Sequence, residues 1–212
     1  MHNQSAISNK SLINDVQSTV SLKDDDGIFK IKLWKNLLFG LGFFHAVVQE
    51  RRKFGAIGWN ITYEFNDNDL KTSMEMIRNF LTNGKEIPWD AMKFMTGDIN
   101  YGGNVTDDFD RKLLQNILEI YQTEELSLNP DYRFSPSGIY FCPQSDDYND
   151  VLKYIDNLPI EDEPEIFGMH QNANIIFRRK EGNKLIKTVL DVQPRTSNSA
   201  DAQGDEESSE SQ

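Results

Sequence analysis

The sequence predicts a mainly α-helical bundle, followed by a partial segment of mixed structure and then by a disordered acidic tail. Apolar side chains recur at helical spacing in several stretches between residues 32 and 122. After Asn129-Pro130 the helical spacing of apolar residues is interrupted, and the nearby prolines favour short extended pieces. From Pro194 onward Ser, Asp, Glu, Gln and Gly dominate, a composition that buries too little apolar surface to fold.

The first strong element is a long helix over Lys32–Lys53. Its apolar residues surround the middle of the helix, so we expect both sides of it to be buried; they are Trp34, Leu37, Leu38, Leu41, Phe44, Val47 and Val48. The run Arg51-Arg52-Lys53 is interpreted as a charge clamp at the negative end of the helix dipole, with a phosphate contact as the alternative. Gly55 then supplies a stop.

An aromatic connector, Gly58–Phe65, separates this helix from the next one. Trp59, Tyr63 and Phe65 are expected to pin the connector to the helices, with Trp59 as the packing anchor. A second helix is predicted over Asn68–Leu81, capped by Asn66 or Asp67, with an apolar stripe of Leu70, Met74, Ile77 and Leu81.

Two further helices complete the predicted bundle. Pro88 suits the first turn of a helix over Pro88–Met95. Thr106 can cap a helix over Asp107–Gln122, which starts with acids and has a broad apolar face of Phe109, Leu113, Leu114, Ile117, Leu118 and Tyr121.

The second half of the chain is predicted to be less regular. Short extended pieces are expected within Tyr132–Tyr140, and a fifth helix within Asp146–Asn157. One helical turn is expected at Glu165–Met169, and a last amphipathic helix at Lys184–Val192.

Charge and cysteine content bear on the partners and on the setting. The formal net charge of the 212 residues is −12, and residues 144–165 and 196–212 carry −7 and −5 of it. The remainder is neutral, which disfavours nucleic-acid binding because phosphates require clustered cations. Cys142 is the only cysteine, so an internal disulfide is excluded and a reducing, intracellular setting fits. The apolar run Leu37–Val48 is shorter than a bilayer span, and Met1–Asn14 lacks the apolar centre of a signal peptide, so no membrane partner is expected.

The search for chemistry predicts no catalytic, cofactor-binding or metal-ligating residue, and no cofactor. No Gly-x-x-x-x-Gly-Lys-Ser/Thr loop occurs, and the closest string, Gly182–Thr188, lacks the second glycine. His45 sits in the most apolar helix and is interpreted as a core histidine with one hydrogen-bonded nitrogen. Asp107, Asp108 and Asp110 stand at a helix start, where capping and solvation explain them better than a metal does.

Several strings, in a fixed order, resemble the C-terminal motor region of dynein heavy chains, and those of axonemal type most of all. The match covers about residues 33–177 and rests on many separate motifs. They are Leu37–Leu41, Phe43–Gly55, Gly58–Ile61, Tyr63–Asp67 with Asp69–Leu70, Ile87–Ala91, Asn100–Arg111, Asp131–Tyr132, Phe134–Tyr140, Leu158–Pro159 and Pro164–His170.

The resemblance implies a domain organisation. Residues 31–126 would form a lid-like helical domain of the sixth AAA+ module, and residues 127–193 the start of the C-terminal domain. Residues 1–30, with one short helix around Ser11–Val20, would be a weakly ordered lead, and residues 194–212 the disordered acidic tail. The ATP-binding modules, stalk and tail of the family are missing, so we expect a fragment, a truncated product or a diverged remnant.

The resemblance also implies a function. The chain would be a structural, mechanical part of a minus-end-directed microtubule motor, without an ATP site and not an enzyme by itself. Its partners would be other parts of the motor ring and the light and intermediate chains of the dynein complex, with microtubules engaged only indirectly. The location implied is the cytoskeleton of the cytoplasm, in the ciliary axoneme. The alternative is a stand-alone adaptor that binds dynein or other partners, and an independent enzyme is least favoured.

Overall fold

The computed structural model describes residues 25–83, 86–145 and 147–192, and it divides the chain into two compact units, residues 1–177 and 178–212. The described residues are mainly helical, and their β pairing is one isolated antiparallel bridge between Arg133 and Phe141. The predicted mainly α fold class is therefore confirmed. The expected short helix at Ser11–Val20 and the acidic tail lie outside the described residues.

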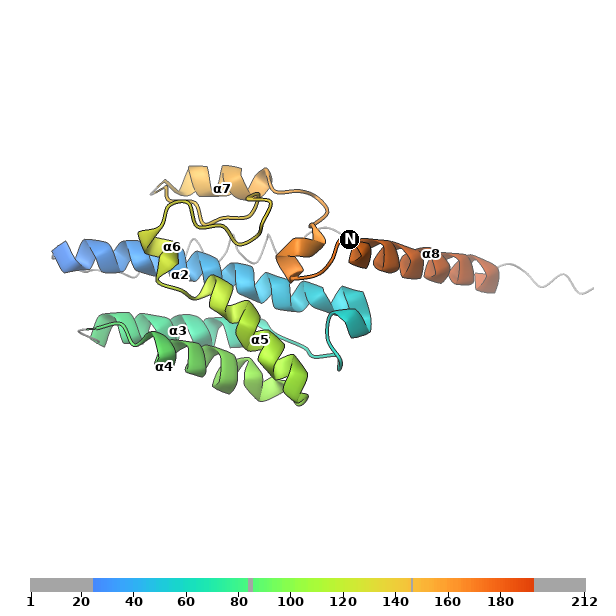
Figure 1. Ribbon diagram of the computed structural model, residues 1–212, viewed down its shortest axis with the longest axis horizontal. Coiled ribbons are helices and arrows are strands. Elements are labelled where there is room, and N and C mark those ends of the chain that lie inside the picture. Colours follow the sequence, from blue (N-terminus) through green and yellow to red (C-terminus); the bar gives the residue numbers. More distant parts are fainter. Residues whose placement is uncertain (1–24, 84–85, 146, 193–212) are drawn as a thin grey trace, which may run out of the picture. The chain divides into compact units, whose positions relative to one another are not determined.

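The central element of the first unit is α2, Asp25–Glu50, which continues into the 3-10 helix η1, Arg51–Ile57 (Figure 1). At 100° per residue, Leu38 and His45 lie on the opposite side of α2 from Asn36 and Val47, and all four are buried. The expectation that both sides of this helix are buried is thus confirmed. The helix starts at Asp25, seven residues before the expected Lys32.

The next helices pack around α2. They are α3, Asp67–Asn83; α4, Trp89–Phe94; the π-helix η2, Met95–Asn100; the 3-10 helix η3, Gly102–Asn104; α5, Asp108–Tyr121; and α6, Glu125–Leu128. α2 contacts α3, α5 and α6, and α3 contacts α4. In Figure 1, α3 runs beside α2, and α4 lies on the other side of α3. The predicted stripe of α3 is confirmed, with Leu70, Ile77 and Leu81 buried and Met74 half-buried.

Two details of α5 differ from the prediction. Its cap is Asp107, not Thr106, because the Asp107 carboxylate accepts from the backbone N–H of Phe109 at 2.9 Å and of Asp110 at 3.0 Å. Phe109 points outward and is 76% exposed. The buried side of α5 instead holds Asp110, Leu114, Ile117, Leu118 and Tyr121, and Phe109 lies about 100° away from Asp110 around the helix.

The second half of the unit packs on the same core. It contains α7, Tyr148–Asp156; the 3-10 helix η4, Pro164–Phe167; and the start of α8, Asn172–Val192, which begins well before the expected Lys184. The Phe134 ring lies 5.3 Å from that of Phe43 on α2, between centroids. The predicted boundary at residue 126 therefore falls inside one compact unit, and the division into two domains there stays a prediction.

One described helical stretch, Lys30–Ile57, is long and apolar enough to cross a membrane by length and composition alone. It is longer than the apolar run Leu37–Val48 because α2 and η1 are continuous. Of its apolar window, 67% is buried inside the protein. Burial of that extent is what a core helix requires, and α2 is such a helix.

Gly40 marks the closest approach of α2 to the later helices. A Cβ atom added at Gly40 would overlap the backbone carbonyl oxygen of Tyr121 and would lie 3.2 Å from Leu126 Cδ1. Backbone atoms cannot move aside as a flexible side chain can. Glycine at this position therefore lets α2 approach the end of α5 and the start of α6.

We predict that Gly40→Ala destabilises the protein by about 2 kcal/mol, because overpacking against backbone outweighs the helix propensity that alanine adds. Urea unfolding followed by circular dichroism measures this. The matched control is Gly103→Ala, since a Cβ at Gly103 meets no atom within 4 Å. That variant should stay within about 0.5 kcal/mol of the parent. Equal stability of the two variants would contradict the close approach.

Candidate functional site

His45 lies in the core, as predicted. Its Nδ1 is 2.9 Å from the hydroxyl oxygen of Tyr101, while its Nε2 has no hydrogen-bond partner among the described residues. Burial lowers the pKa of His45 from its ordinary value of 6.5, and the nearby Asp67 and Asp69 oppose that shift in part. The ring is therefore neutral at pH 7 and serves packing between α2 and the segment that contains Tyr101.

Arg51 does not form the charge clamp that the sequence suggested. It is buried beyond the last residue of α2, and its Nε and Nη2 donate to the carbonyl of Gly58 at 3.1 and 3.0 Å. Its Nη1 donates to the carbonyl of Phe167. Burial lowers the pKa of Arg51 to about 10, a shift that Asp110 opposes. The guanidinium is thus bound to the carbonyls of Gly58 and Phe167, so its donors are already used and do not face a phosphate.

The three aspartates at the start of α5 have three different roles. Asp107 caps the helix, which agrees with the predicted capping role of these aspartates, and Asp108 is exposed to solvent. Asp110 is only 3% exposed and points into the protein. They do not converge on one point, and within the described ranges no group of three or more His, Cys, Asp or Glu residues could hold a metal ion.

The interpretation of Asp110 as a capping or solvated aspartate is wrong, because its side chain is buried and bonded to the connector. Its carboxylate accepts from the backbone N–H of Asn60 at 3.0 Å and of Ile61 at 3.2 Å, and from the hydroxyl of Tyr63 at 2.9 Å. Three donors satisfy a buried carboxylate and offset much of its desolvation. The carboxylate thereby fastens the aromatic connector to α5.

Trp59 fastens the same connector to α2. Its Nε1 donates to the carbonyl of Val48 at 3.1 Å, and its ring meets that of Tyr63 edge-on at 5.8 Å. The Arg51 guanidinium lies 5.4 Å from the centre of the Trp59 ring. The prediction of Trp59 as a buried anchor is confirmed. We call Arg51, Trp59 and Asp110, with the connector they hold, the connector joint.

Two other sequence candidates lie apart from this joint. The string Gly182–Thr188 is part of α8, and a helical backbone uses its N–H groups internally instead of cradling a phosphate. Cys142 is buried, and burial raises the pKa of its thiol to about 12, so it is protonated at neutral pH.

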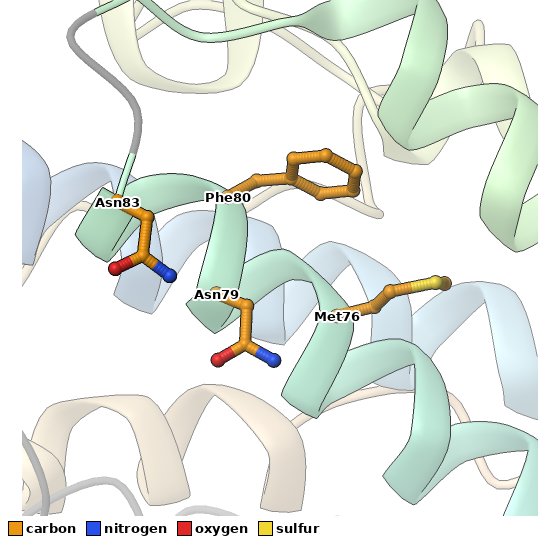
Figure 2. A pocket seen from close by; sticks show the side chains of 4 residues that line it. All are labelled: Met76, Asn79, Phe80 and Asn83. Carbon is orange, nitrogen blue, oxygen red and sulfur yellow. The ribbon is translucent and has the colours of Figure 1, made fainter.

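A pocket of about 410 Å³ lies on α3, and Figure 2 shows the four side chains that line it. They are Met76, Asn79, Phe80 and Asn83. None of these four titrates near neutral pH, so the pocket offers apolar and amide surface without an acid, a base or a nucleophile.

These arrangements define the class of protein. Three buried polar side chains of the first unit, Arg51, Trp59 and Asp110, join helices and connector to one another, so the described geometry is that of a helical packing module. The comparisons with known proteins then supply the family. The model of the dynein heavy chain AAA lid domain matches residues 34–173, and the chain therefore belongs to the dynein heavy chain family.

Several curated relatives are similar over most of the chain. Human dynein axonemal heavy chain 6 is 48% identical over 176 residues, which are 83% of this chain. Mouse dynein axonemal heavy chain 12 is 45% identical over 74% of the chain, and human dynein axonemal heavy chain 1 is 44% identical over 92%. The matched residues are only 4–5% of the length of these relatives.

We predict that Asp110→Ala destabilises the protein by about 3 kcal/mol, because it leaves three buried or half-buried donors without their acceptor. Asp108→Ala is the matched control, since Asp108 is exposed in the same helical turn and should change stability by no more than about 0.5 kcal/mol. Thermal and urea unfolding measure both variants. If Asp110→Ala were as mild as its control, the joint would not hold the connector.

We also predict a pH dependence from His45. Since its folded pKa is below the ordinary 6.5, the unfolded chain binds the proton more readily. Stability should therefore be full above pH 6.5 and should fall as the pH drops from 6.5 toward 5, above the range where ordinary carboxylates titrate. Urea unfolding at pH 7.5 and 5.2 should show this loss, and His45→Gln should reduce it. A folded-state NMR midpoint for His45 at or above 6.5 would refute the prediction.

Proposed function

We propose that residues 34–173 act as the lid-type mechanical part of an axonemal dynein motor, a minus-end-directed microtubule motor. The match to the dynein lid family and the axonemal relatives support this assignment. The task of such a part is to carry displacements between neighbouring modules. Close-packed helices suit that task because they move as units.

The single observation that carries the proposal is the packing around α2. This helix contacts α3, α5, α6 and η4, so a displacement at one of its sides is felt by all of them. The connector joint adds polar links at its C-terminal end, through Arg51 to Gly58 and Phe167. A helix held on several sides and at one end transmits motion with little internal loss.

The proposal assigns no ATP hydrolysis to this chain by itself, in line with the missing Gly-x-x-x-x-Gly-Lys-Ser/Thr loop. Its partners would be other parts of a dynein ring, the light and intermediate chains of the dynein complex, and microtubules only through them. Nucleic acid and membrane are not among the proposed partners, and the place of action would be the ciliary axoneme. The small share of each relative that the chain covers supports its being a fragment of a heavy chain. The finer division, a lid over residues 31–126 followed by the start of a C-terminal domain over residues 127–193, is part of the proposal, and the match to the lid family itself runs on to residue 173.

The experiment is a segment exchange in a motile axonemal heavy chain. The segment of that relative which aligns with residues 34–173 is replaced by residues 34–173 of this chain, and microtubule gliding and ATPase activity are measured. We expect gliding at more than about half of the parent velocity, since the packing that transmits motion is kept. A chimera that folds and hydrolyses ATP but does not move microtubules would refute the mechanical role.

Two variants of the chimera sharpen the result. Asp110→Ala loosens the connector joint and should reduce gliding more than ATPase activity, while Asp108→Ala should leave both unchanged. The chain alone, purified and assayed with ATP, should show no turnover above that of a heat-inactivated sample. Turnover by the chain alone would refute the absence of hydrolysis without touching the mechanical role.

A further inference from the structure

The side chain of Lys53, on η1, lies among three aromatic rings. Its Nζ is 5.3 Å from the centre of the Phe54 ring, 5.0 Å from that of Phe167 and 5.7 Å from that of Phe177. An ammonium within about 6 Å of a ring centre is attracted to the negative face of the ring. Lys53 therefore makes three such contacts at once, and the rings come from η1, η4 and α8.

The surroundings of this ammonium strengthen the contacts. The Phe54 ring lies 5.3 Å from that of Phe167 and 5.7 Å from that of Phe177, between centres. Phe54 and Phe167 are buried, and the Lys53 side chain keeps 27% of its surface exposed. A carboxylate oxygen of Glu50 lies 3.3 Å from the ammonium. A cation that is partly withdrawn from water is attracted to ring faces more strongly than one at an open surface.

Phe177 stands at a boundary of the chain. It is the last residue of the first unit, and α8 continues past it as one helix. It follows the buried Ala173 by four residues, so both side chains lie on the same face of α8. The hydrogen bonds at the start of α8 are local, such as the one from the Ala173 N–H to the carbonyl of His170 at 2.9 Å. Local bonds start a helix without fixing its direction, which then depends on the packing of Ala173 and Phe177.

We propose that Lys53 is a positioning residue whose ammonium latches the start of α8 onto η1. The ammonium attracts the Phe177 ring of α8 while it also contacts the Phe167 ring of η4, and Glu50 keeps it in place. The first turns of α8 thereby take their direction from the C-terminal end of α2, with which η1 is continuous. The latch is a property of this chain and does not depend on the mechanical role proposed above.

Apolar packing of Phe177 on Phe54 is the alternative, and it needs no cation. In that case the lysine contributes only its methylene stem, and methionine would serve equally well. In the latch the charge is required, so arginine can replace the lysine and methionine cannot. The convergence of three rings from three elements on one Nζ favours the charge.

The first measurement is the NMR shift of the Lys53 ε-methylene protons in the full chain, assigned by their loss in Lys53→Arg. Ring currents move protons above an aromatic face upfield, so we expect these protons upfield of the common lysine position. Phe177→Leu keeps an apolar side chain but removes one ring, and it should move them part of the way back. Lys53 protons at the common position, or a shift that Phe177→Leu leaves unchanged, would overturn the latch.

Hydrogen exchange followed by mass spectrometry then measures how firmly the start of α8 is held. Lys53→Gln and Lys53→Met should each speed exchange within residues 174–177 by about threefold, the scale of a cation–π contact partly withdrawn from water. Lys53→Arg should exchange as the parent does. Arg52→Gln is the matched control, because it removes an exposed cation of the same helix η1 and should leave exchange at the start of α8 unchanged.

Two outcomes of the exchange experiment would refute the proposal. Protection in Lys53→Met equal to that of the parent would show that apolar packing holds α8. Faster exchange in α3 by the same factor as at the start of α8 would show a general loss of stability instead of a role specific to α8. Faster exchange confined to the start of α8, with rescue by arginine, is the result that the latch predicts.

Discussion

Burial of α2 on all its sides is the constraint on which the rest of the first unit depends. A helix that is apolar around its circumference cannot rest against a single neighbour, so later segments must come to it from several directions. α3, α5, α6 and η4 do so, and Gly40 sets how closely the end of α5 can approach. The order of the other helices in space follows from the need to cover this one.

The buried polar groups are placed where the chain must change direction. α2 ends at Glu50, and the chain turns back through the connector before α3 starts at Asp67. Backbone groups of such a turn need partners once they are buried. Arg51 supplies donors for the carbonyls of Gly58 and Phe167, and Asp110 supplies an acceptor for the N–H groups of Asn60 and Ile61. The cationic side chain thus satisfies backbone acceptors of this region, and the anionic side chain satisfies backbone donors.

Periodic features of the fold could be predicted from the sequence, and long-range ones could not. The stripe of Leu70, Ile77 and Leu81 and the anchor Trp59 follow from local spacing and from aromatic content. The burial of Arg51 and Asp110 follows from contacts across about 50 to 115 residues, which no local pattern encodes. Because Asp110 occupies the buried side of α5, the neighbouring Phe109 points outward. A prediction that leaves Asp110 exposed therefore also places Phe109 wrongly. The motifs of the family resemblance, by contrast, were visible in the sequence without any knowledge of these contacts.

The two units differ in how far their apolar side chains are covered. In residues 25–177 the large apolar residues of α2 are covered by the protein itself, so the contacts that stabilise the bundle are the ones that would carry the proposed displacement. In residues 178–192 a helix of comparable apolar character keeps its face exposed. Residues 178–192 continue α8, whose start is buried in the first unit at Ala173, so the first turn of this helix is formed by packing and not by a partner.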